Sequence, residues 1–255
     1  AVGWLYGADR LYQLPLGVVG IAIGIVLLPD MSRKLKAKDT AGARAAYSRA
    51  AEISLALTLP AAMALCVIPL PLVSVLFERG ATTAADTASM AQAVAIYGLG
   101  LPAFILQKLL QPLFFAREDT RTPFRYAVIS MVINAALAIG LIPVFGWLAP
   151  AVATSVAGWA MVCLLALGAR RFGQEARFDA RFKSRLWRIV AASAAMGVLL
   201  FVGQTMAGQS FYIAGWRYLA LIGLVLVGLV SYAGFGQAMG AFTFAEYRAA
   251  LRRSS

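Results

Sequence analysis

The sequence contains no histidine, only two cysteines, and few acidic residues, with 11 Asp and Glu against 23 Lys and Arg. The lack of histidine excludes Ser–His and Cys–His nucleophilic catalysis and histidine-ligated zinc. Cys66 and Cys163 lie in apolar runs without metal-ligand spacing, so we expect two packed thiols and no metal site. The basic excess gives a formal net charge of +12, and the distribution of these charges indicates what they contact.

Hydrophobic residues make up 61% of the chain, against roughly half in soluble proteins, so a soluble domain is excluded. All but three of the 23 basic residues fall in four clusters separated by long apolar stretches. The clusters span residues 33–49, 108–125, 170–188 and 248–253. Nucleic-acid binding needs a contiguous basic face, which this alternation does not provide. We therefore expect anionic membrane lipids, and not nucleic acid, as partners of the clusters.

Apolar runs of about 20 residues predict seven membrane-spanning helices. They lie at 1–28, 50–77, 88–116, 124–144, 148–170, 187–207 and 216–240. The loops after the first, third and fifth helices carry basic clusters, whereas the others carry only Arg79 and Arg217. Because basic residues collect on the cytoplasmic side, we expect a cytoplasmic C-terminus and an external residue 1.

An external N-terminus requires a signal peptide or a preceding helix. Residues 1–6 contain neither a positively charged leader nor an initiator Met. We therefore expect this chain to be the C-terminal part of a longer protein. The alternative is a complete seven-helix receptor; a retinal protein of that kind needs a lysine in its last helix, and residues 216–240 contain none.

Two basic segments are expected at the inner membrane surface. Residues 30–38, followed by 41–51, predict a short interfacial helix. The linker at 170–188, with aromatic residues between its charges, either lies on the same surface or is a solvated loop. Glu52 is expected at the start of the second spanning helix, where a carboxylate suits the positive helix end.

Arg10 lies within the first predicted helix, where a charge costs roughly 2.5–3.5 kcal/mol at the bilayer centre. On a helix Arg10 and Gln13 share a face, whereas Asp9 points about 100° away. The guanidinium either pairs with a carboxylate such as Asp9, reaches the outer surface, or faces a wet cavity and binds an anionic substrate, a phosphate being its natural match. The candidate substrate-binding residues are Arg10, Gln13 and Asp9.

Few other polar groups lie within the predicted spans. Asn134 and Thr154 are expected to hydrogen-bond between helices. The alternative, a cation site, would want a carboxylate, and residues 124–169 contain no Asp or Glu; a site completed by another part of the protein stays open. Gln92, Gln107 and Gln111 are expected to line a cavity or to lie at its ends.

A second motif, Phe115 to Pro123, joins the third and fourth predicted helices. Pro123 fits the first turn of a helix, with Thr122 or Thr120 as cap and Asp119 near its positive end. The motif indicates a tight cytoplasmic turn and carries no information about a substrate. Its structural residues are taken as Arg117, Asp119, Thr122 and Pro123.

Three features together resemble the MurJ (MviN) family of lipid II flippases, part of a superfamily of multidrug and polysaccharide exporters. They are the stretch Ala8 to Gly17 with its continuation to Pro29, the turn at 115–123, and the order of seven helices. The resemblance covers the whole chain and implies an all-α, two-lobed, MATE-like carrier with about fourteen helices. Residues 1–186 would belong to its second lobe, and 187–255 would form a final helix pair with a lipid-tail groove and a cytoplasmic tail.

The resemblance implies that lipid II, an undecaprenyl diphosphate-linked precursor, moves from the inner to the outer leaflet of the bacterial cytoplasmic membrane by alternating access. Arg10 matches a family arginine that faces the central cavity and meets the diphosphate. Other cavity arginines would belong to the missing N-terminal lobe. Gln13 departs from the pattern, because some relatives carry an acidic residue there. No bond is made or broken, so we expect neither enzyme activity nor a cofactor.

Three alternatives stay open at this point. The first is an exporter of another substrate, such as a polysaccharide-lipid flippase or a drug/cation antiporter. An antiporter needs an intramembrane carboxylate, and apart from Glu52 at the start of a predicted span only Asp9 lies within one. A membrane enzyme acting on polyprenyl phosphates needs clustered acids, whereas Glu118 and Asp119 are the only adjacent pair. A non-transport scaffold for cell-wall synthesis would leave Arg10 replaceable.

Overall fold

The computed structural model describes residues 2–37, 39–78, 83–208 and 216–241, and its regular secondary structure in these ranges is helical. The prediction of an all-α protein is confirmed. The long helices are α1 (Val2–Lys36), α2 (Thr40–Val67), α4 (Ala84–Phe115), α5 (Arg121–Gly140), α7 (Ala149–Ala169), α8 (Ala180–Ala207) and α9 (Trp216–Ala238). The short elements are α3 (Pro69–Phe77), α6 (Ile142–Phe145) and the 3-10 segments η1 (Gly146–Leu148) and η2 (Arg170–Ala176).

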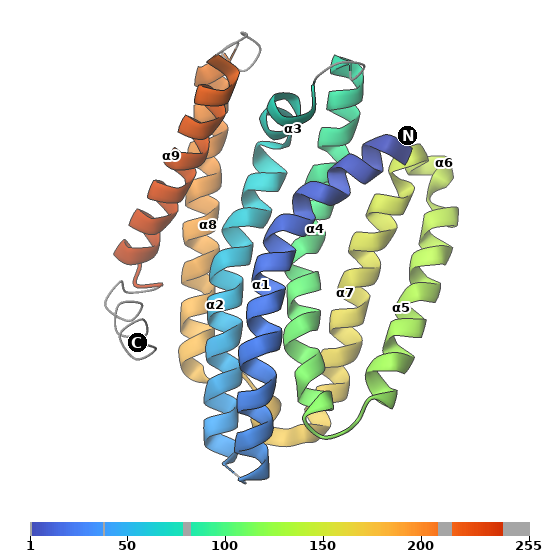
Figure 1. Ribbon diagram of the computed structural model, residues 1–255, viewed down its shortest axis with the longest axis vertical. Helices are drawn as coiled ribbons and strands as arrows, with labels where there is room; N and C mark the ends of the chain where they lie inside the picture. The colour runs from blue at the N-terminus through green and yellow to red at the C-terminus, as the bar shows by residue number, and fades with distance from the viewer. Residues whose placement is uncertain (1, 38, 79–82, 209–215, 242–255) are drawn as a thin grey trace.

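The long helices stand side by side along the long axis of the molecule (Figure 1). The pair α8 and α9 occupies one edge and α5 the other, with α2, α1, α4 and α7 between them. Helix α1 packs along both α2 and α4, and α7 packs between α4 and α5. One buried core joins Tyr47 of α2, Leu109 of α4 and Leu165 of α7.

Six helices in the described ranges are long and apolar enough to cross a membrane. They are α2, α4, α5, the segment Ile142–Gly173 that contains α7, α8 and α9. The seven predicted spans correspond to these six and to α1. Many apolar side chains of the outer helices are exposed, for example Val132 and Ile139 of α5 and Val230 of α9. Such extended apolar surfaces are typical of a membrane-embedded protein.

The three basic loops lie together at one end of the bundle. The α1–α2 connection, the α4–α5 turn and η2 occupy the lower end in Figure 1, whereas α3 and α6 lie toward the upper end. We call these the basic end and the far end. This placement agrees with the alternation of loops read from the sequence.

The predicted interfacial helix at residues 30–38 is wrong. Helix α1 continues through Pro15 and Pro29 to Lys36, so the basic segment is the end of α1. Asp30 pairs with Arg33 and with Lys34, at 2.6 and 2.7 Å, and pairs at these spacings favour a helix. The lysine ammonium and the guanidinium lower the pKa of the Asp30 carboxyl. Residues 41–51 form the first turns of α2.

The second predicted helix is also revised at both ends. Helix α2 starts at Thr40, where the Asp39 carboxylate accepts a hydrogen bond from the Gly42 amide at 2.8 Å. The helix ends before Ile68, and α3 begins at Pro69. The residue before a proline is pushed out of the helical region, which explains a break within the predicted span 50–77.

Glu52 is therefore not at a helix start, contrary to the sequence-based expectation. It lies in the fourth turn of α2, and its carboxylate is paired with Arg185 and, at 3.6 Å, with Arg181 of α8. Helix α8 begins at Ala180, where Asp179 accepts from the Phe182 amide at 2.7 Å. Much of the linker predicted at 170–188 is thus helical.

Helices α8 and α9 pack against each other, α8 also against α2 and α9 against α3. The division of the chain into 1–186 and 187–255 stays a prediction. The first helix of the pair begins at Ala180, so residue 187 falls inside α8.

Candidate functional site

One side of α1 is exposed along its first half. Its residues recur at spacings of three and four, which places them on one helical face. They are Tyr6, Arg10, Gln13, Leu14, Gly17 and Val18, which we call the open face of α1. The opposite side buries Ala8, Leu11 and Val19. Helix α1 is therefore fixed to the bundle by one face and presents polar groups on the other.

Aromatic packing holds α1 to α4 beside this face. The Tyr12 ring lies 5.0 Å from Tyr97 and 5.6 Å from Phe104, between centroids. Both partners belong to α4. Aromatic pairs of this kind add about 0.5–1.5 kcal/mol to the stability that burial of their surface already provides. They therefore fix the position of the neighbouring open face.

Arg10 is exposed on the open face and leans one turn toward the far end. Its Nη2 donates to the hydroxyl of Tyr6, and its guanidinium lies 4.8 Å from the Tyr6 ring centroid. Among the described residues no carboxylate is within ion-pair distance of Arg10. The pairing of Arg10 with Asp9, one of the alternatives, is thus not found; Asp9 instead accepts a hydrogen bond from the Gln13 amide.

The depth of Arg10 follows from a tryptophan marker at the far end. The Trp4 indole donates to Asp86 at 2.8 Å, and its ring meets Trp147 at 5.0 Å. Tryptophans of this kind gather at membrane interfaces. Arg10 follows Trp4 by six residues, which places it about 9 Å deeper at 1.5 Å per residue. A cation at that depth points to a water-filled or protein-lined environment.

The turn between α4 and α5 is joined to η2 by polar contacts of residues that were predicted to be structural. The Asp119 carboxylate accepts from the Thr122 amide at 3.0 Å and pairs with Arg171, which also donates to the Thr122 hydroxyl at 3.2 Å. Arg117 donates to the Leu113 carbonyl at 2.7 Å. Pro123 is buried in the first turn of α5. Thr120 occupies the N-cap position, one of the two predicted, but its side chain makes no capping hydrogen bond; Asp119 supplies that bond instead.

The pKa of Asp119 is lowered, first by its hydrogen bonds from Thr122 and then by Arg171. A lowered folded-state pKa stabilises the fold above the ordinary carboxyl pKa of about 3.9, and this contribution is lost as pH falls through the lowered value. Asp119→Asn is therefore expected to melt below the parent protein at neutral pH. The difference should shrink below about pH 4, and a difference that persists there would contradict the ionic role.

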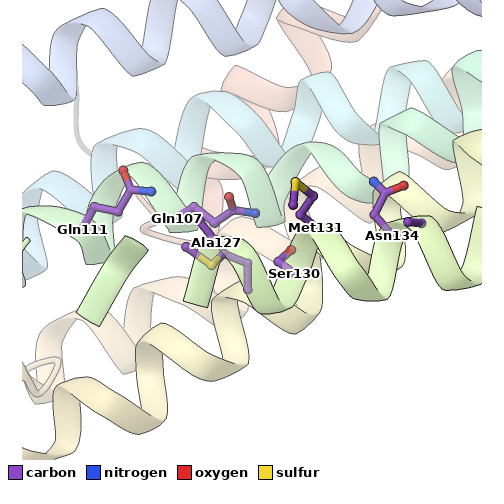
Figure 2. A pocket seen from close by; sticks show the side chains of 8 residues that line it. Gln107, Gln111, Ala127, Ser130, Met131 and Asn134 are labelled. Carbon is purple, nitrogen blue, oxygen red and sulfur yellow. The ribbon is translucent and has the colours of Figure 1, made fainter. Parts of the chain in front are cut away.

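A cavity of about 460 Å³ lies between α4, α5 and α7. Figure 2 shows its lining extending from Gln111 at one end to Asn134 at the other. The polar lining groups serve helix–helix contacts: Gln107 donates to the Gly158 carbonyl at 3.0 Å, and Ser130 to that of Ala157 at 2.8 Å. Gln107 and Gln111 line this cavity, as predicted, whereas Gln92 is exposed elsewhere on α4 and is not part of the lining.

Asn134 and Thr154 lie close to each other, as predicted. The Asn134 amide donates to the Thr154 hydroxyl at 3.3 Å, and that hydroxyl donates to the Pro150 carbonyl at 2.8 Å. The described residues contain no cluster of three or more His, Cys, Asp or Glu side chains that could hold a metal ion. The interhelical hydrogen bond is therefore the role that the geometry supports.

Lys108 was counted from the sequence with the basic cluster at 108–125, although the residue lies inside the predicted span 88–116. The side chain belongs to α4, seven residues before the helix ends at Phe115, and is exposed. The available signal was its isolation: the next basic residue along the chain is Arg117, and the residues between are uncharged.

The structure thus has long helices with apolar outer surfaces, polar groups along an open cavity between helices, and a cation on an exposed helix face. Together these features define a polytopic membrane protein. Residues 1–227 match the family described as Lipid II flippase MurJ. The chain belongs to this family.

Curated relatives agree with this assignment. The chain is 40% identical over 258 residues to the probable lipid II flippase MurJ of Rhizobium meliloti, covering 100% of this chain and 48% of that one. It is 35% identical over 234 residues to the probable lipid II flippase MurJ of Vibrio cholerae, covering 91% of this chain and 44% of that one. The chain thus spans about half the length of these relatives.

A solved structure, a lipid II flippase MurJ in an inward closed conformation, shares the fold. Its TM-score is 0.76 with 24% identity, over 93% of this chain and 46% of the other. The arrangement of helices described above is therefore that of one part of a larger transporter fold.

Proposed function

We propose that this chain works as part of a flippase that moves lipid II from the inner to the outer leaflet of the bacterial cytoplasmic membrane by alternating access. Membership of the lipid II flippase family supports this transport activity. The observation that carries the role of this chain is Arg10, a cation exposed on the open face, within the first predicted span, and without an ion pair in the described part of the chain.

Arg10 would bind the diphosphate of lipid II. A guanidinium makes short, charge-assisted hydrogen bonds to phosphate oxygens, and such bonds strengthen where bulk water is excluded. Tyr6 holds the guanidinium by one hydrogen bond. Gln13 and Asp9, which are hydrogen-bonded to each other one turn along, would contact the sugar or peptide groups of the same substrate.

The open face of α1 would meet a second lobe. The relatives contain about as much additional chain as the length matched here, and an N-terminal lobe packed opposite α1 would enclose the cavity between them. Movement of the two lobes would expose Arg10 to each side of the membrane in turn. Transport of this kind makes and breaks no bond, so the protein would not be an enzyme.

The orientation follows from charge. The basic end would face the cytoplasm, where basic residues concentrate and anionic lipids attract them. Residue 1 would then be external and the C-terminus cytoplasmic. The turn residues Arg117, Asp119, Thr122 and Pro123 would have a structural role at this face. The pair α8 and α9 would hold the lipid tail of the substrate outside the polar cavity.

Complementation tests this function in cells. The complete protein is expected to sustain growth and wall synthesis in bacteria depleted of their own lipid II flippase. Cells that accumulate lipid II and lyse, despite verified membrane insertion of the protein, would contradict the proposal.

Gln13→Glu is expected to be tolerated in the same complementation. The new carboxylate would lie one turn from Arg10 on an exposed face, and attraction to the guanidinium offsets repulsion from Asp9. Growth close to that of the parent is the expected result. Complete loss of function would show that the amide of Gln13, and its hydrogen bond to Asp9, is required.

A further inference from the structure

Lys108 is a second cation within the membrane-spanning part of the bundle. It lies seven residues before the end of α4, about 10 Å from that end at 1.5 Å per residue. An ammonium at such a depth is costly unless it meets water or an anion. Among the described residues it has neither a hydrogen bond nor an ion pair.

The side chain of Lys108 lies against α1 because residue 20 is a glycine. A Cβ at Gly20 would lie 2.8 Å from Cδ, 2.9 Å from Cε and 3.3 Å from Nζ of Lys108. The missing side chain thus leaves the space in which the lysine extends along α1. This contact places the ammonium of Lys108 beside α1.

Gly20 follows Arg10 by ten residues, about 15 Å along the helix axis. The ammonium of Lys108 therefore lies about 15 Å closer to the basic end than the Cα of Arg10. Two cations thus follow one another along α1.

We propose that Lys108 binds the phosphate groups of the lipid-linked substrate in the half of the membrane nearer the basic end, before or after they reach Arg10. This proposal rests on the proposed function. A single cation cannot contact a diphosphate over the whole crossing, because its reach is a few ångströms. A lysine is suited to a passing contact, since its ammonium is a point charge on a flexible stem.

Transport measured against lipid II concentration tests the role of Lys108. The complete protein, Lys108→Met, Lys108→Arg and Lys183→Met are each placed in phosphatidylcholine vesicles without anionic phospholipid. Lys183 is an exposed residue at the start of α8 and controls for the loss of one positive charge. Melting temperatures of all four proteins verify the fold.

Lys108→Met is expected to raise the half-saturating lipid II concentration about tenfold, the effect of losing one charge-assisted hydrogen bond. Lys108→Arg should stay close to the parent, and so should Lys183→Met. An unchanged half-saturating concentration in Lys108→Met would overturn the proposal. So would a defect that appears only when phosphatidylglycerol is added, because the lysine would then bind a phospholipid and not the substrate. Absence of transport by the unaltered protein would instead overturn the proposed function itself.

Discussion

Arg10→Ala is expected to abolish support of growth by the complete protein while leaving its fold and membrane insertion intact. The side chain is exposed on the open face and forms one side-chain hydrogen bond, to Tyr6, so little packing is lost. Its charge, in contrast, would be the main attraction for a diphosphate at this depth. Growth of cells depleted of their own flippase is the measurement, with protein levels in the membrane determined in parallel.

Two variants on the same helix sharpen this prediction. Leu14→Ala changes an exposed apolar residue one turn away, 69% accessible, and is expected to support growth. Arg10→Lys keeps the charge but not the planar fork of donors and is expected to retain partial function. Normal growth supported by Arg10→Ala alone would eliminate the substrate contact and would favour a scaffold role for this chain.

Glu52→Ala is expected to lower the free energy of unfolding by roughly 3 kcal/mol, the lower end of the range for a broken buried ion pair. Glu52 and Arg185 join α2 to α8, and their side chains are only 12% and 15% exposed. Removing the carboxylate takes the charge of Glu52 away from a guanidinium that is mostly buried. Thermal unfolding of the purified protein should show a melting temperature several degrees lower.

The double variant Glu52→Leu with Arg185→Met provides the control. Replacement of both charges by apolar groups of similar size is close to neutral in many proteins, so this variant is expected to recover most of the lost stability. Arg181, with a side chain 45% exposed, can turn to water in both variants. A double variant as unstable as Glu52→Ala would indicate that packing around Glu52, and not the ion pair, joins the two helices.

The spanning helices and the alternation of basic loops could be predicted because hydropathy and charge are local properties of the sequence. The same reasoning left three placements of Arg10 open, and the structure finds the side chain exposed and not paired with Asp9. The continuation of α1 through Pro29 did not, since proline usually ends a helix and the Asp30 pairs with Arg33 and Lys34 act against that tendency.

Contacts between distant segments could not be predicted from local patterns. Glu52 and Arg185 are 133 residues apart in the chain, and nothing near either residue indicates the other. Arg171, which pairs with Asp119 of the turn, was likewise counted only as part of a basic cluster. Lys108 was counted with the basic cluster at 108–125, and only its contact with Gly20 of α1, a residue far away in the chain, separates it from that cluster.

The most direct test of substrate binding by Arg10 is to measure the appearance of lipid II on the outer face of vesicles. The vesicles contain the complete protein, its Arg10→Ala variant or its Leu14→Ala variant. We expect transport by the unaltered protein and by Leu14→Ala, and none above the protein-free background by Arg10→Ala. Equal transport by all three proteins would contradict the claim that the open face of α1 carries the substrate through Arg10.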